Sequence, residues 1–563
     1  MMSRVIFLAG NYPKIFLKGI SLRNIAILIC LGFVVLFVGN NILPLTNPDE
    51  VFYVETAKEM AQRSTWTTPY IFDQPQFEKP VLTYDLIRIG FLMFGDTPFA
   101  ARFFPALFGL LGVLAVYSMA RWTYEDDRKA WVAGIVLMTS GLYFGLSRTV
   151  FTDMIFTVFI LLSLAAFYSA YLRPAWKTPG LILFHVFAAF AVLAKGPLGY
   201  MMPLLTVLIF LGVRGQLRFL ASKAFWAGFI LFWMLAGPWY GFMFKHYDGA
   251  FIREFFYNDH WRRLLEAEHT KNDKWYFYPA SMLGCMFPWV CFVAAAFWAA
   301  GKACIDKRAS VLQQFLLIWI AVVFVTFQVA HSKLVSYIFP LFPAMALLAA
   351  DDLVDRVNRG CRAVLTMMIV TWGLCALIPV VLLVAAVKYP MYIPSKASFL
   401  FVFGVESFFV AVAGFFTFRK KVWMSIGLFA VQLPLIFFLI LMVHHNVELY
   451  VSTRPAVEYL MQGRDVQGKI MCSKFFVRGV KYFSGKDVVL MNVNSPNFFS
   501  PHPVPDLNTD EKLSGFLRTQ PVTYGIVNNH AWEDLQRMGP SYGFKAELLK
   551  LVGDEYVVKV TPK

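Results

Sequence analysis

Acidic and basic side chains recur beside the apolar runs of this chain, and their types could carry out phosphate and proton chemistry. Asp49 follows the first apolar run in "TNPDEVFYVE", and Asp153 opens a later run in "SRTVFTDMIF". Lys79 in "QFEKPVLTY", Arg263 in "NDHWRRLL" and Lys333 in "HSKLVSY" supply cations. Cations stabilise the charge that develops on a departing phosphate, and a carboxylate can remove a proton from an attacking hydroxyl. This mixed set predicts a site for a phosphate-linked lipid donor and an external acceptor.

Other polar side chains share these segments and complete the candidate set. They are Glu50, Tyr53, Glu78, Tyr84, Arg148, Lys195, His260, Arg262, His331 and Tyr337. Each candidate also has a purely structural explanation. The segment Asn47-Pro48-Asp49-Glu50 is a good helix start, with an N-cap amide, a proline and acids at the positive end of the helix dipole. Lysines at membrane edges can extend to lipid headgroups. The combination of acids and cations at one face indicates function more strongly than any single residue.

Long apolar runs must position these residues. The chain has 563 residues, of which 58% are apolar and only 15% are charged, and this composition is typical of a polytopic membrane protein. The first run has no small-residue cleavage site and therefore does not look like a signal peptide. Runs of about 20 residues predict about thirteen transmembrane helices. They lie near residues 24–45, 100–120, 130–147, 151–171, 180–194, 198–213, 224–242, 277–300, 311–330, 334–350, 363–387, 398–417 and 422–443.

The positive charge of the chain sets its topology in the membrane. The net charge of +16 does not indicate nucleic-acid binding, because many Lys and Arg residues lie in short connections between apolar runs. Arg4, Lys14, Lys18 and Arg23 precede the first run, and basic clusters follow every second run after it. This alternation predicts a cytoplasmic N-terminus and, with an odd number of spans, an external C-terminal region. The seven cysteines form no C-x-x-C pair and indicate neither a disulfide framework nor a zinc site.

The external connections are where we expect the chemistry. Residues 46–99 and 243–276 are long, mix charged and aromatic residues, and are predicted to form the active-site face of a membrane domain spanning residues 1–444. Residues 50–63 predict a helix lying in the membrane interface, with a second helix after Pro80. Its apolar face would carry Tyr53, Val54, Ala57, Met60 and Ala61, and its polar face Glu55, Lys58, Glu59 and Arg63.

The composition turns soluble at about residue 445. Residues 453–462 and 510–519 predict helices, whereas residues 469–476, 487–492 and 522–527 predict strands. Residues 548–560 predict a hairpin that turns at Gly553-Asp554. Residues 445–563 are therefore predicted to form a small α/β domain on the periplasmic side.

Six motifs occur in a fixed order and together are specific. In these motifs, which lie within residues 25–350, the chain resembles lipid-carrier-dependent glycosyltransferases of the GT-C superfamily. It is most similar to the bacterial aminoarabinose transferases that modify lipid A. The motifs are P-D-E-x-x-Y-x-E (Pro48 to Glu55), F-E-K-P (Phe77 to Pro80), the acid Asp153, K-G (Lys195-Gly196), H-x-x-R (His260 and Arg263) before Trp275-Tyr276, and S-K-L-x-x-Y-I (Ser332 to Ile338).

The resemblance implies a fold, an activity and a cellular location. The fold would be a GT-C membrane domain. The enzyme would move a sugar, such as 4-amino-4-deoxy-L-arabinose, from an undecaprenyl (polyprenyl) phosphate carrier to lipid A or another envelope glycolipid. The reaction would take place at the periplasmic side of the bacterial inner membrane, among membrane lipids and without nucleic acid.

The resemblance also implies roles for individual residues. Asp49 would be the essential carboxylate and Asp153 the second acid, while Lys79, Arg263 and Tyr337 would hold the polyprenyl phosphate. No cofactor is required, although Glu78 and His260 match positions that can bind a divalent metal such as zinc. The chain departs from the aminoarabinose transferases at Phe52, Met154 and Leu334-Val335-Ser336-Tyr337, where they often carry Arg, Pro and L-P-T-Y. These departures leave the sugar and the acceptor open.

Two questions stay open at this level. Asp49 would act as a base on a hydroxyl nucleophile, whereas with a phosphate nucleophile it would orient the sugar or stabilise positive charge at the anomeric carbon. The alternative functions are a transporter or flippase of a lipid-linked sugar and a scaffold that presents the C-terminal domain. A transporter usually binds its substrate near the midplane between repeated halves. The one-sided cluster and the absence of a visible repeat favour the transferase.

Overall fold

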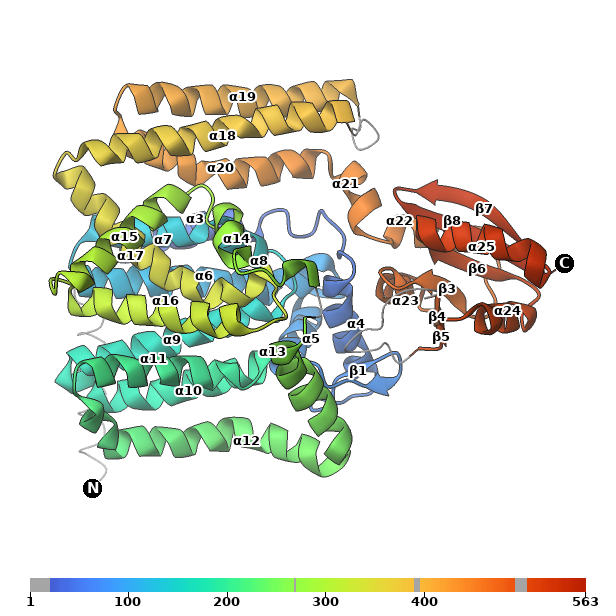
Figure 1. Ribbon diagram of the computed structural model, residues 1–563, viewed down its shortest axis with the longest axis horizontal. Coiled ribbons are helices and arrows are strands. Elements are labelled where there is room, and N and C mark those ends of the chain that lie inside the picture. Colours follow the sequence, from blue (N-terminus) through green and yellow to red (C-terminus); the bar gives the residue numbers. More distant parts are fainter. Residues whose placement is uncertain (1–20, 268–269, 389–394, 492–503, 563) are drawn as a thin grey trace.

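The computed structural model describes residues 21–267, 270–388, 395–491 and 504–562. It shows a bundle of long helices with a small sheet domain at one end (Figure 1). The basic residues Arg4, Lys14 and Lys18, on which the topology prediction partly depends, lie outside the described residues. The arrangement agrees with the predicted fold class, an α-helical membrane protein with a C-terminal α/β unit.

The bundle consists of apolar helices of membrane-spanning length. In the part of the chain that the structure describes, nine helical segments are long and apolar enough to cross a membrane. They are α6 (Pro98–Tyr124), α9 (Thr152–Leu172), η1 (Pro174–Trp176) with α10 (Lys177–Lys195), α12 (Lys223–Phe251) with η3 (Ile252–Arg262) and α13 (Arg263–Leu265), α16 (Val311–Val329), η5 (Val335–Leu341) with α17 (Phe342–Asn358), α18 (Arg362–Lys388), α19 (Lys396–Phe418) and α20 (Val422–Met442).

Shorter helices occupy the remaining predicted spans. Three of them are apolar and have 10 to 17 residues: α3 (Leu22–Phe37), α11 (Leu198–Val213) and α15 (Val290–Ile305). The predicted span at 130–147 is divided into α7 (Asp127–Met138) and α8 (Gly141–Leu146), and α14 (Phe277–Cys285) precedes α15. Every predicted span therefore corresponds to helical structure, and the chain is a multi-pass membrane protein.

The helices differ in how much of their surface the protein itself covers. The most apolar stretch of α9 is 67% buried and that of the η5–α17 segment 78%, whereas those of α18 and α19 are only 22% buried. In Figure 1, α18, α19 and α20 form a layer at the edge of the bundle. Exposed apolar side chains there include Leu377, Val381 and Phe408. Such a surface needs lipid around it, while α9 and α17 form the rigid centre that can hold a site.

The segment between α3 and α6 folds into two helices and a small hairpin. The helices are α4 (Asp49–Gln62) and α5 (Leu82–Phe94), and the hairpin pairs β1 (Tyr70–Ile71) with β2 (Gln74–Pro75). Both helices were predicted, but the start of α4 differs from the prediction. The position before the helix is Pro48 instead of Asn47, and no side chain caps it. Glu50 instead reaches back and accepts hydrogen bonds from the backbone N–H and hydroxyl of Thr46 at 3.0 and 2.9 Å.

Helix α4 forms where it was predicted, but its polar face is not all exposed. Glu55 and Glu59 on that face are buried, with exposed fractions of 6% and 5%. Helix α23 (Val477–Ser484) of the sheet domain packs against α4 and covers it. Figure 1 shows α4 at the junction between the bundle and the sheet domain. The sequence of α4 alone contains no sign of this second layer.

The burial of Glu55 predicts a pH-dependent stability. Burial, together with the nearby Glu59, raises the pKa of Glu55 from 4.5 to about 7. The folded state therefore holds a proton that the unfolded chain releases, and stability decreases as the pH rises between about 4.5 and about 7. We expect Glu55→Gln to remove this decrease and to stabilise the protein above pH 7 by on the order of 2 kcal/mol. Thermal unfolding of both proteins in detergent at a series of pH values measures this difference in stability.

The matched control for this experiment is Glu511→Gln, which changes an exposed acid of the same type. This control should keep the pH slope of the wild type. The same slope in Glu55→Gln as in wild type would contradict the assignment of the titration to Glu55.

The C-terminal part is an α/β unit with a six-stranded sheet. The sheet order is β5-β4-β3-β6-β8-β7; β5, β4, β3 and β6 are parallel neighbours, while β8 runs antiparallel to both β6 and β7. The strands are β3 (Ile470–Ser473), β4 (Val488–Met491), β5 (Asp506–Leu507), β6 (Thr523–Val527), β7 (Phe544–Val552) and β8 (Glu555–Pro562). The predicted hairpin is confirmed, and Gly553 has the positive φ of 60° that its turn requires.

Helices cover both faces of this sheet. The predicted helices are α22 (Arg454–Met461) and α24 (Asp510–Arg518); α21 (His444–Val451), α23 and α25 (Asn529–Tyr542) were not predicted. Helices α22 and α23 pack in one core with α4, whereas α24 and α25 pack in a separate core on the other face. All described strands of the large sheet follow residue 444, and the division of the chain at 444 and 445 stays a prediction.

Candidate active site

A cavity of about 1310 Å³ lies between the helical bundle and the sheet domain. Its walls come from the start of α4, the loop before α5, the start of α9, the turn after α10, the η3–α13 segment and the loop before η5. Two loops of the sheet domain close the remaining side. The predicted site residues that line it are Asp49, Tyr53, Glu78, Lys79, Asp153, Lys195, His260, Arg263 and Tyr337.

Two cations are held together by one acid in the cavity wall. Asp259 accepts a hydrogen bond from Lys79 Nζ at 2.6 Å and forms an ion pair with an Arg263 Nη at 2.8 Å. The Asp259 side chain is only 5% exposed, while those of Lys79 and Arg263 are 12% and 18% exposed. Arg263 also donates to the Tyr337 hydroxyl at 3.4 Å. One buried carboxylate and two cations leave a net positive wall, and such a wall suits a phosphate.

The second acid is paired on the opposite side of Tyr337. Lys195 Nζ lies 2.6 Å from Asp153 Oδ1, at the point where α9 begins and α10 ends. The Lys195 ammonium also lies 5.2 Å from the centre of the Tyr337 ring. Tyr337 therefore connects the Asp153–Lys195 pair to the Asp259 cluster, and the five charged groups form one continuous polar lining.

The acid Asp49 enters the cavity from the first residue of α4. It is exposed, and Tyr53 lies one turn further along the same helix. Burial raises the pKa of Tyr53 well above its usual value, and the neighbouring Tyr84, Asp153 and Asp49 act in the same direction. Tyr53 thus stays a neutral hydrogen-bond donor at physiological pH, and Asp49 and Asp153 share its surroundings.

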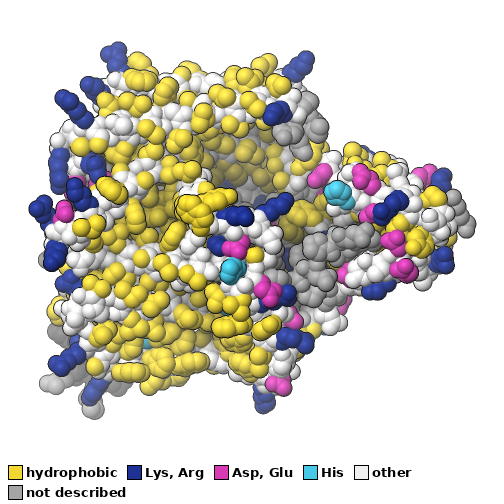
Figure 2. Space-filling view, in the orientation of Figure 1, with side chains coloured by type: hydrophobic (Ala, Val, Ile, Leu, Met, Phe, Trp, Pro, Cys, Tyr) yellow, Lys and Arg dark blue, Asp and Glu magenta, His cyan; other side chains and the backbone are white. Residues whose placement is uncertain are grey.

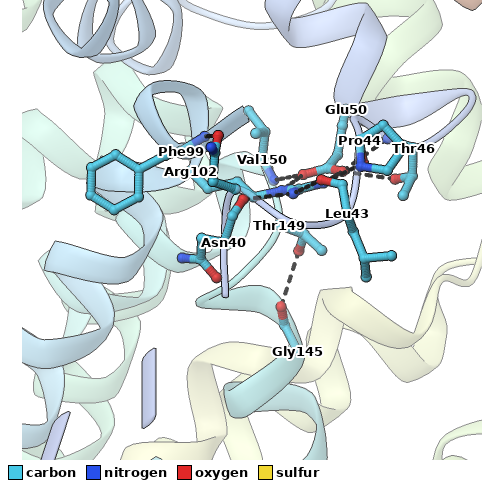
Figure 3. A network of polar contacts seen from close by, with 11 residues as sticks. Asn40, Leu43, Pro44, Thr46, Glu50, Phe99, Arg102, Gly145, Thr149 and Val150 are labelled. Atoms are coloured by element: carbon cyan, nitrogen blue, oxygen red, sulfur yellow. Dashed lines mark hydrogen bonds and ion pairs between the residues drawn. The ribbon is translucent and has the colours of Figure 1, made fainter. Parts of the chain in front are cut away.

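Glu50 lies outside the cavity and serves as a structural anchor (Figure 3). Its carboxylate accepts Arg102 Nε at 2.8 Å and an Arg102 Nη at 2.6 Å, and it also accepts the backbone N–H of Val150 at 2.9 Å. Burial acts to raise the pKa of Glu50, but Arg102 and the hydrogen bonds outweigh it and hold the pKa below the usual value. The network joins α4, α6 and the approach to α9, which fixes Asp49 relative to Asp153.

We expect Glu50→Gln to destabilise the protein strongly. Arg102 would then be a buried cation without a counter-charge, and removal of one partner of a buried pair costs about 3–5 kcal/mol. The thermal midpoint in detergent should fall by many degrees. The control is Glu458→Gln, which breaks the exposed ion pair between Glu458 and Arg454. This change should alter the free energy of unfolding by less than about 1 kcal/mol and leave the midpoint nearly unchanged. Equal effects of the two changes would contradict the anchoring role.

Two further candidates hold the structure around the cavity. Arg148 donates to the backbone carbonyls of Val35 and Val38 and lies over the Phe437 ring, so it ties the segment before α9 to α3 and α20. Tyr84 is fully buried behind Tyr53 and accepts a hydrogen bond from the side chain of Gln76 at 2.5 Å. The structure does not bring either side chain into the cavity.

The remaining basic candidates are paired beside the cavity. Lys333 Nζ and His331 Nδ1 lie 2.6 and 2.8 Å from the Asp273 carboxylate, and Arg262 pairs with Glu266 at 2.8 Å. These three candidates do not line the cavity. The backbone carbonyl of Arg263 accepts the N–H of Ser332 at 3.0 Å, so the His331–Lys333 segment supports Arg263 from behind.

The predicted metal pair lies in an environment that does not fit a metal ion. Within residues 21–267, 270–388, 395–491 and 504–562, no group of three or more His, Cys, Asp and Glu side chains could hold one. His260 Nδ1 lies 2.6 Å from the Phe255 carbonyl, and its Nε2 faces Gly196. Burial raises the pKa of Glu78, and the charges nearest to it include the cations Arg478 and Lys79. We therefore derive no step through a metal, and the metal pair stays a prediction.

Sequence reasoning missed several residues of the lining. Asp259 adjoins the predicted His260, and its spacing of four from Arg263 could have indicated the ion pair. Lys474, Phe475 and Asn528 come from loops of the sheet domain, and Arg478 comes from the first turn of α23. They lie more than 130 residues further along the chain than the other site residues, and nothing local in the sequence places them at the cavity.

Comparison with known proteins finds similar transferases. Residues 25–248 match the family described as dolichyl-phosphate-mannose-protein mannosyltransferase. An undecaprenyl phosphate-alpha-4-amino-4-deoxy-L-arabinose arabinosyl transferase 2 of Pseudomonas fluorescens is 31% identical over 331 residues, which cover 56% of this chain and 54% of the relative. Another such arabinosyl transferase, from Edwardsiella ictaluri, is 30% identical and covers 56% and 58%.

A solved structure decides the fold. The crystal structure of ArnT from Cupriavidus metallidurans bound to undecaprenyl phosphate superimposes with a TM-score of 0.76 and covers 95% of this chain and 97% of that chain at 21% identity. The chain therefore has the same fold as that structure. Its resemblance to the lipid A aminoarabinose transferases is confirmed. The chain spans little more than half the length of the two arabinosyl transferases it matches in sequence.

Proposed function

We propose that this GT-C protein is an integral-membrane glycosyltransferase. It transfers a sugar from a polyprenyl-phosphate carrier to lipid A or another envelope acceptor on the periplasmic side. The names of the relatives indicate 4-amino-4-deoxy-L-arabinose as the sugar and undecaprenyl phosphate as the carrier. The observation that carries the proposal is the cavity in which Lys79 and Arg263 converge beside the acids Asp49 and Asp153.

The cations stabilise the phosphate leaving group. In the transfer, an oxygen of the acceptor forms a bond to the anomeric carbon while the bond from that carbon to the phosphate oxygen breaks. The electron pair of the broken bond stays on the phosphate, which leaves as polyprenyl phosphate. Lys79, Arg263 and the Tyr337 hydroxyl donate hydrogen bonds where this charge develops. Asp259 holds the two cations in place before the donor enters, so little reorganisation is needed.

The two acids, Asp49 and Asp153, act on the nucleophile and on the sugar. Asp49 accepts the proton when the nucleophile is a hydroxyl. When the nucleophile is a phosphate, which is already anionic, Asp49 instead orients the sugar or stabilises the positive charge at the anomeric carbon. Asp153, fixed by Lys195 at 2.6 Å, faces the same space and orients the sugar hydroxyls. One displacement at the carbon inverts its configuration.

The distribution of charge supports a cytoplasmic N-terminus and a periplasmic sheet domain in the inner membrane. Basic clusters occupy the connections that follow α6, α9–η1, α11, α15, α17 and α19. Lys and Arg side chains gather at the end of the bundle remote from the sheet domain (Figure 2). Basic connections stay on the cytoplasmic side, and this rule puts the cavity on the periplasmic side.

Transfer in detergent micelles tests the proposed function, because micelles have no leaflets between which a lipid could move. Purified protein is mixed with undecaprenyl-phosphate-linked 4-amino-4-deoxy-L-arabinose and bisphosphorylated lipid A. We expect mass spectrometry to show lipid A heavier by one sugar and an equal amount of released undecaprenyl phosphate. An unchanged lipid A with intact donor would contradict the proposed acceptor. Movement of the donor between leaflets of proteoliposomes, without transfer, would favour a flippase.

A further inference from the structure

The sheet domain presents a strand arrangement that in α/β proteins forms ligand sites. Strands β3 and β6 are parallel neighbours, and their connections leave in opposite directions across the sheet. β3 continues through α23 to β4 on one side, whereas β6 continues through α25 to the β7–β8 hairpin on the other. Helices α23 and α25 lie in cores on opposite faces. In such sheets, ligands bind in the crevice outside the carboxyl ends of the strands where the order reverses.

This crevice opens into the cavity described above. Lys474 and Phe475, which directly follow β3, and Asn528, which directly follows β6, line the cavity. The backbone N–H of Asn528 donates to the Ser473 hydroxyl at 2.9 Å and joins the two loops. The crevice of the sheet domain is therefore a wall of the reaction cavity and is not a separate surface site.

The crevice carries a positively charged side chain in a fixed position. The Arg478 guanidinium, in the first turn of α23, lies 4.3 Å from the centre of the Phe52 ring on α4. Its Nε is buried and finds no hydrogen-bond partner among the described residues. Stacking on an aromatic ring holds a guanidinium in place, and its planar N–H groups suit the oxygens of a phosphate.

The close contact between α23 and α4 sets the distance from Arg478 to Asp49. Gly479 lies so near the α4 side that a Cβ there would meet Asn47 Oδ1 at 2.2 Å and Thr453 Oγ1 at 2.3 Å. Tyr482, further along α23, donates to Asp96 at 3.1 Å and lies under the Lys58 ammonium at 4.8 Å. Because Phe52 and Asp49 share one turn of α4, these contacts hold Arg478 and Lys474 at the Asp49 side of the cavity.

The cavity thus has two cationic walls of different origin. Lys79 and Arg263 of the membrane domain share Asp259 and suit the donor phosphate. Lys474 and Arg478 belong to the sheet domain and line the same cavity as Asp49. A donor with one phosphate attached to its sugar does not need both walls.

We propose that Lys474 and Arg478 form an acceptor subsite that binds a phosphate group of the acceptor headgroup. The sheet domain would then select phosphorylated glycolipids and orient them toward Asp49. This inference rests on the proposed function, since it names the acceptor class of the same site. It assigns to the C-terminal domain a direct part in acceptor recognition.

Steady-state kinetics with two lipid acceptors test the subsite. Full-length wild type, Arg478→Ala, Arg478→Lys and Lys474→Ala are compared with bisphosphorylated and monophosphorylated lipid A. We expect Arg478→Ala and Lys474→Ala to raise the KM for bisphosphorylated lipid A about tenfold, with the donor KM nearly unchanged. Arg478→Lys should recover part of the loss because it keeps the charge but not the planar fork. Preference for the bisphosphorylated acceptor should shrink in both Ala variants.

The matched control is Lys486→Ala, an exposed lysine just beyond the other end of α23, which should keep wild-type kinetics. An increased donor KM with an unchanged acceptor KM would overturn the subsite and make Arg478 a partner of Glu78 in donor handling. Equal acceptor KM values in all variants would also overturn it. Lys474→Ala, in a loop, gives an independent test if Arg478→Ala does not fold.

A binding measurement separates this inference from the proposed function. Native mass spectrometry of the detergent-solubilised protein compares bisphosphorylated lipid A with undecaprenyl phosphate. Loss of lipid A binding in Arg478→Ala, with undecaprenyl phosphate binding retained, supports the subsite even if the wild type transfers no sugar. Transfer by a wild type whose lipid A binding does not depend on Arg478 or Lys474 would uphold the proposed function and overturn the subsite.

Discussion

Asp49→Asn is expected to reduce sugar transfer by about 10²–10⁴-fold, the range typical of a lost catalytic carboxylate. The substitution keeps the size of the side chain and its place at the start of α4, but it removes the charge and the ability to accept a proton. We expect the fold to survive, because Glu50, not Asp49, joins α4 to α6. Initial rates of transfer, measured by mass spectrometry of the acceptor lipid, give the effect.

The pH profile of the same variants distinguishes the two possible roles of Asp49. As a base on a hydroxyl, Asp49 should give the wild type an acidic limb in kcat/KM that Asp49→Asn lacks. With a phosphate nucleophile, the residual activity of Asp49→Asn should keep the shape of the wild-type profile. Unchanged rates in a folded Asp49→Asn would contradict both roles.

Loss of the donor-side cations is the second large expected effect. Lys79→Ala and Arg263→Ala should each lower kcat/KM for the donor by about 10²–10³-fold, because each removes a donor aimed at the departing phosphate. Each change also leaves Asp259 with one cation in place of two. Since the two residues act on one group, the double variant should lose less than the product of the single losses.

Arg253→Ala is the control for these cations. Arg253 lies on η3, which leads into Arg263 and α13, but its side chain is 70% exposed and pairs with Glu254. It should behave like the wild type. Lys333→Ala should have a smaller effect than Lys79→Ala, because the structure pairs Lys333 with Asp273 outside the cavity lining. A loss in Lys333→Ala equal to that in Lys79→Ala would instead support the role that its sequence context suggested.

The sequence predicted the membrane helices and much of the cavity lining well, for a physical reason. A span needs about 20 apolar residues, so charged residues at the ends of such runs stand out. Asp49, Asp153, Lys195 and Arg263 all lie at the ends of helices or helical segments, where chain position nearly fixes spatial position. Because successive helices cross the membrane in alternating directions, the predicted topology is enough to put these helix ends on the same side.

Contacts between elements that are far apart in the chain could not be predicted from the sequence. The polar face of α4 looks solvated by its periodicity, yet α23 packs against this helix from about 420 residues later in the chain, and Glu55 and Glu59 are buried. Glu50 and Arg148 look like site residues by type, but they bind Arg102 and backbone carbonyls. Arg478 and Asn528 line the cavity because the connections after the neighbouring strands β3 and β6 leave in opposite directions there. The packing of α23 on α4 and the positions of Arg478 and Asn528 depend on the docking of the sheet domain, whereas the contacts of Glu50 and Arg148 lie within the helical bundle.

The most direct test of the central claim compares wild type with Asp49→Asn in proteoliposomes containing extracted bacterial envelope lipids as donor and acceptor. Mass spectrometry of all lipids after incubation reports both the acceptor and the mass of the sugar. We predict a mass gain on a phosphorylated acceptor lipid with wild type and none with Asp49→Asn, although both proteins are folded and both bind undecaprenyl phosphate. Equal mass gain with both proteins, or movement of a lipid-linked sugar between leaflets with no lipid gaining mass, would contradict the account.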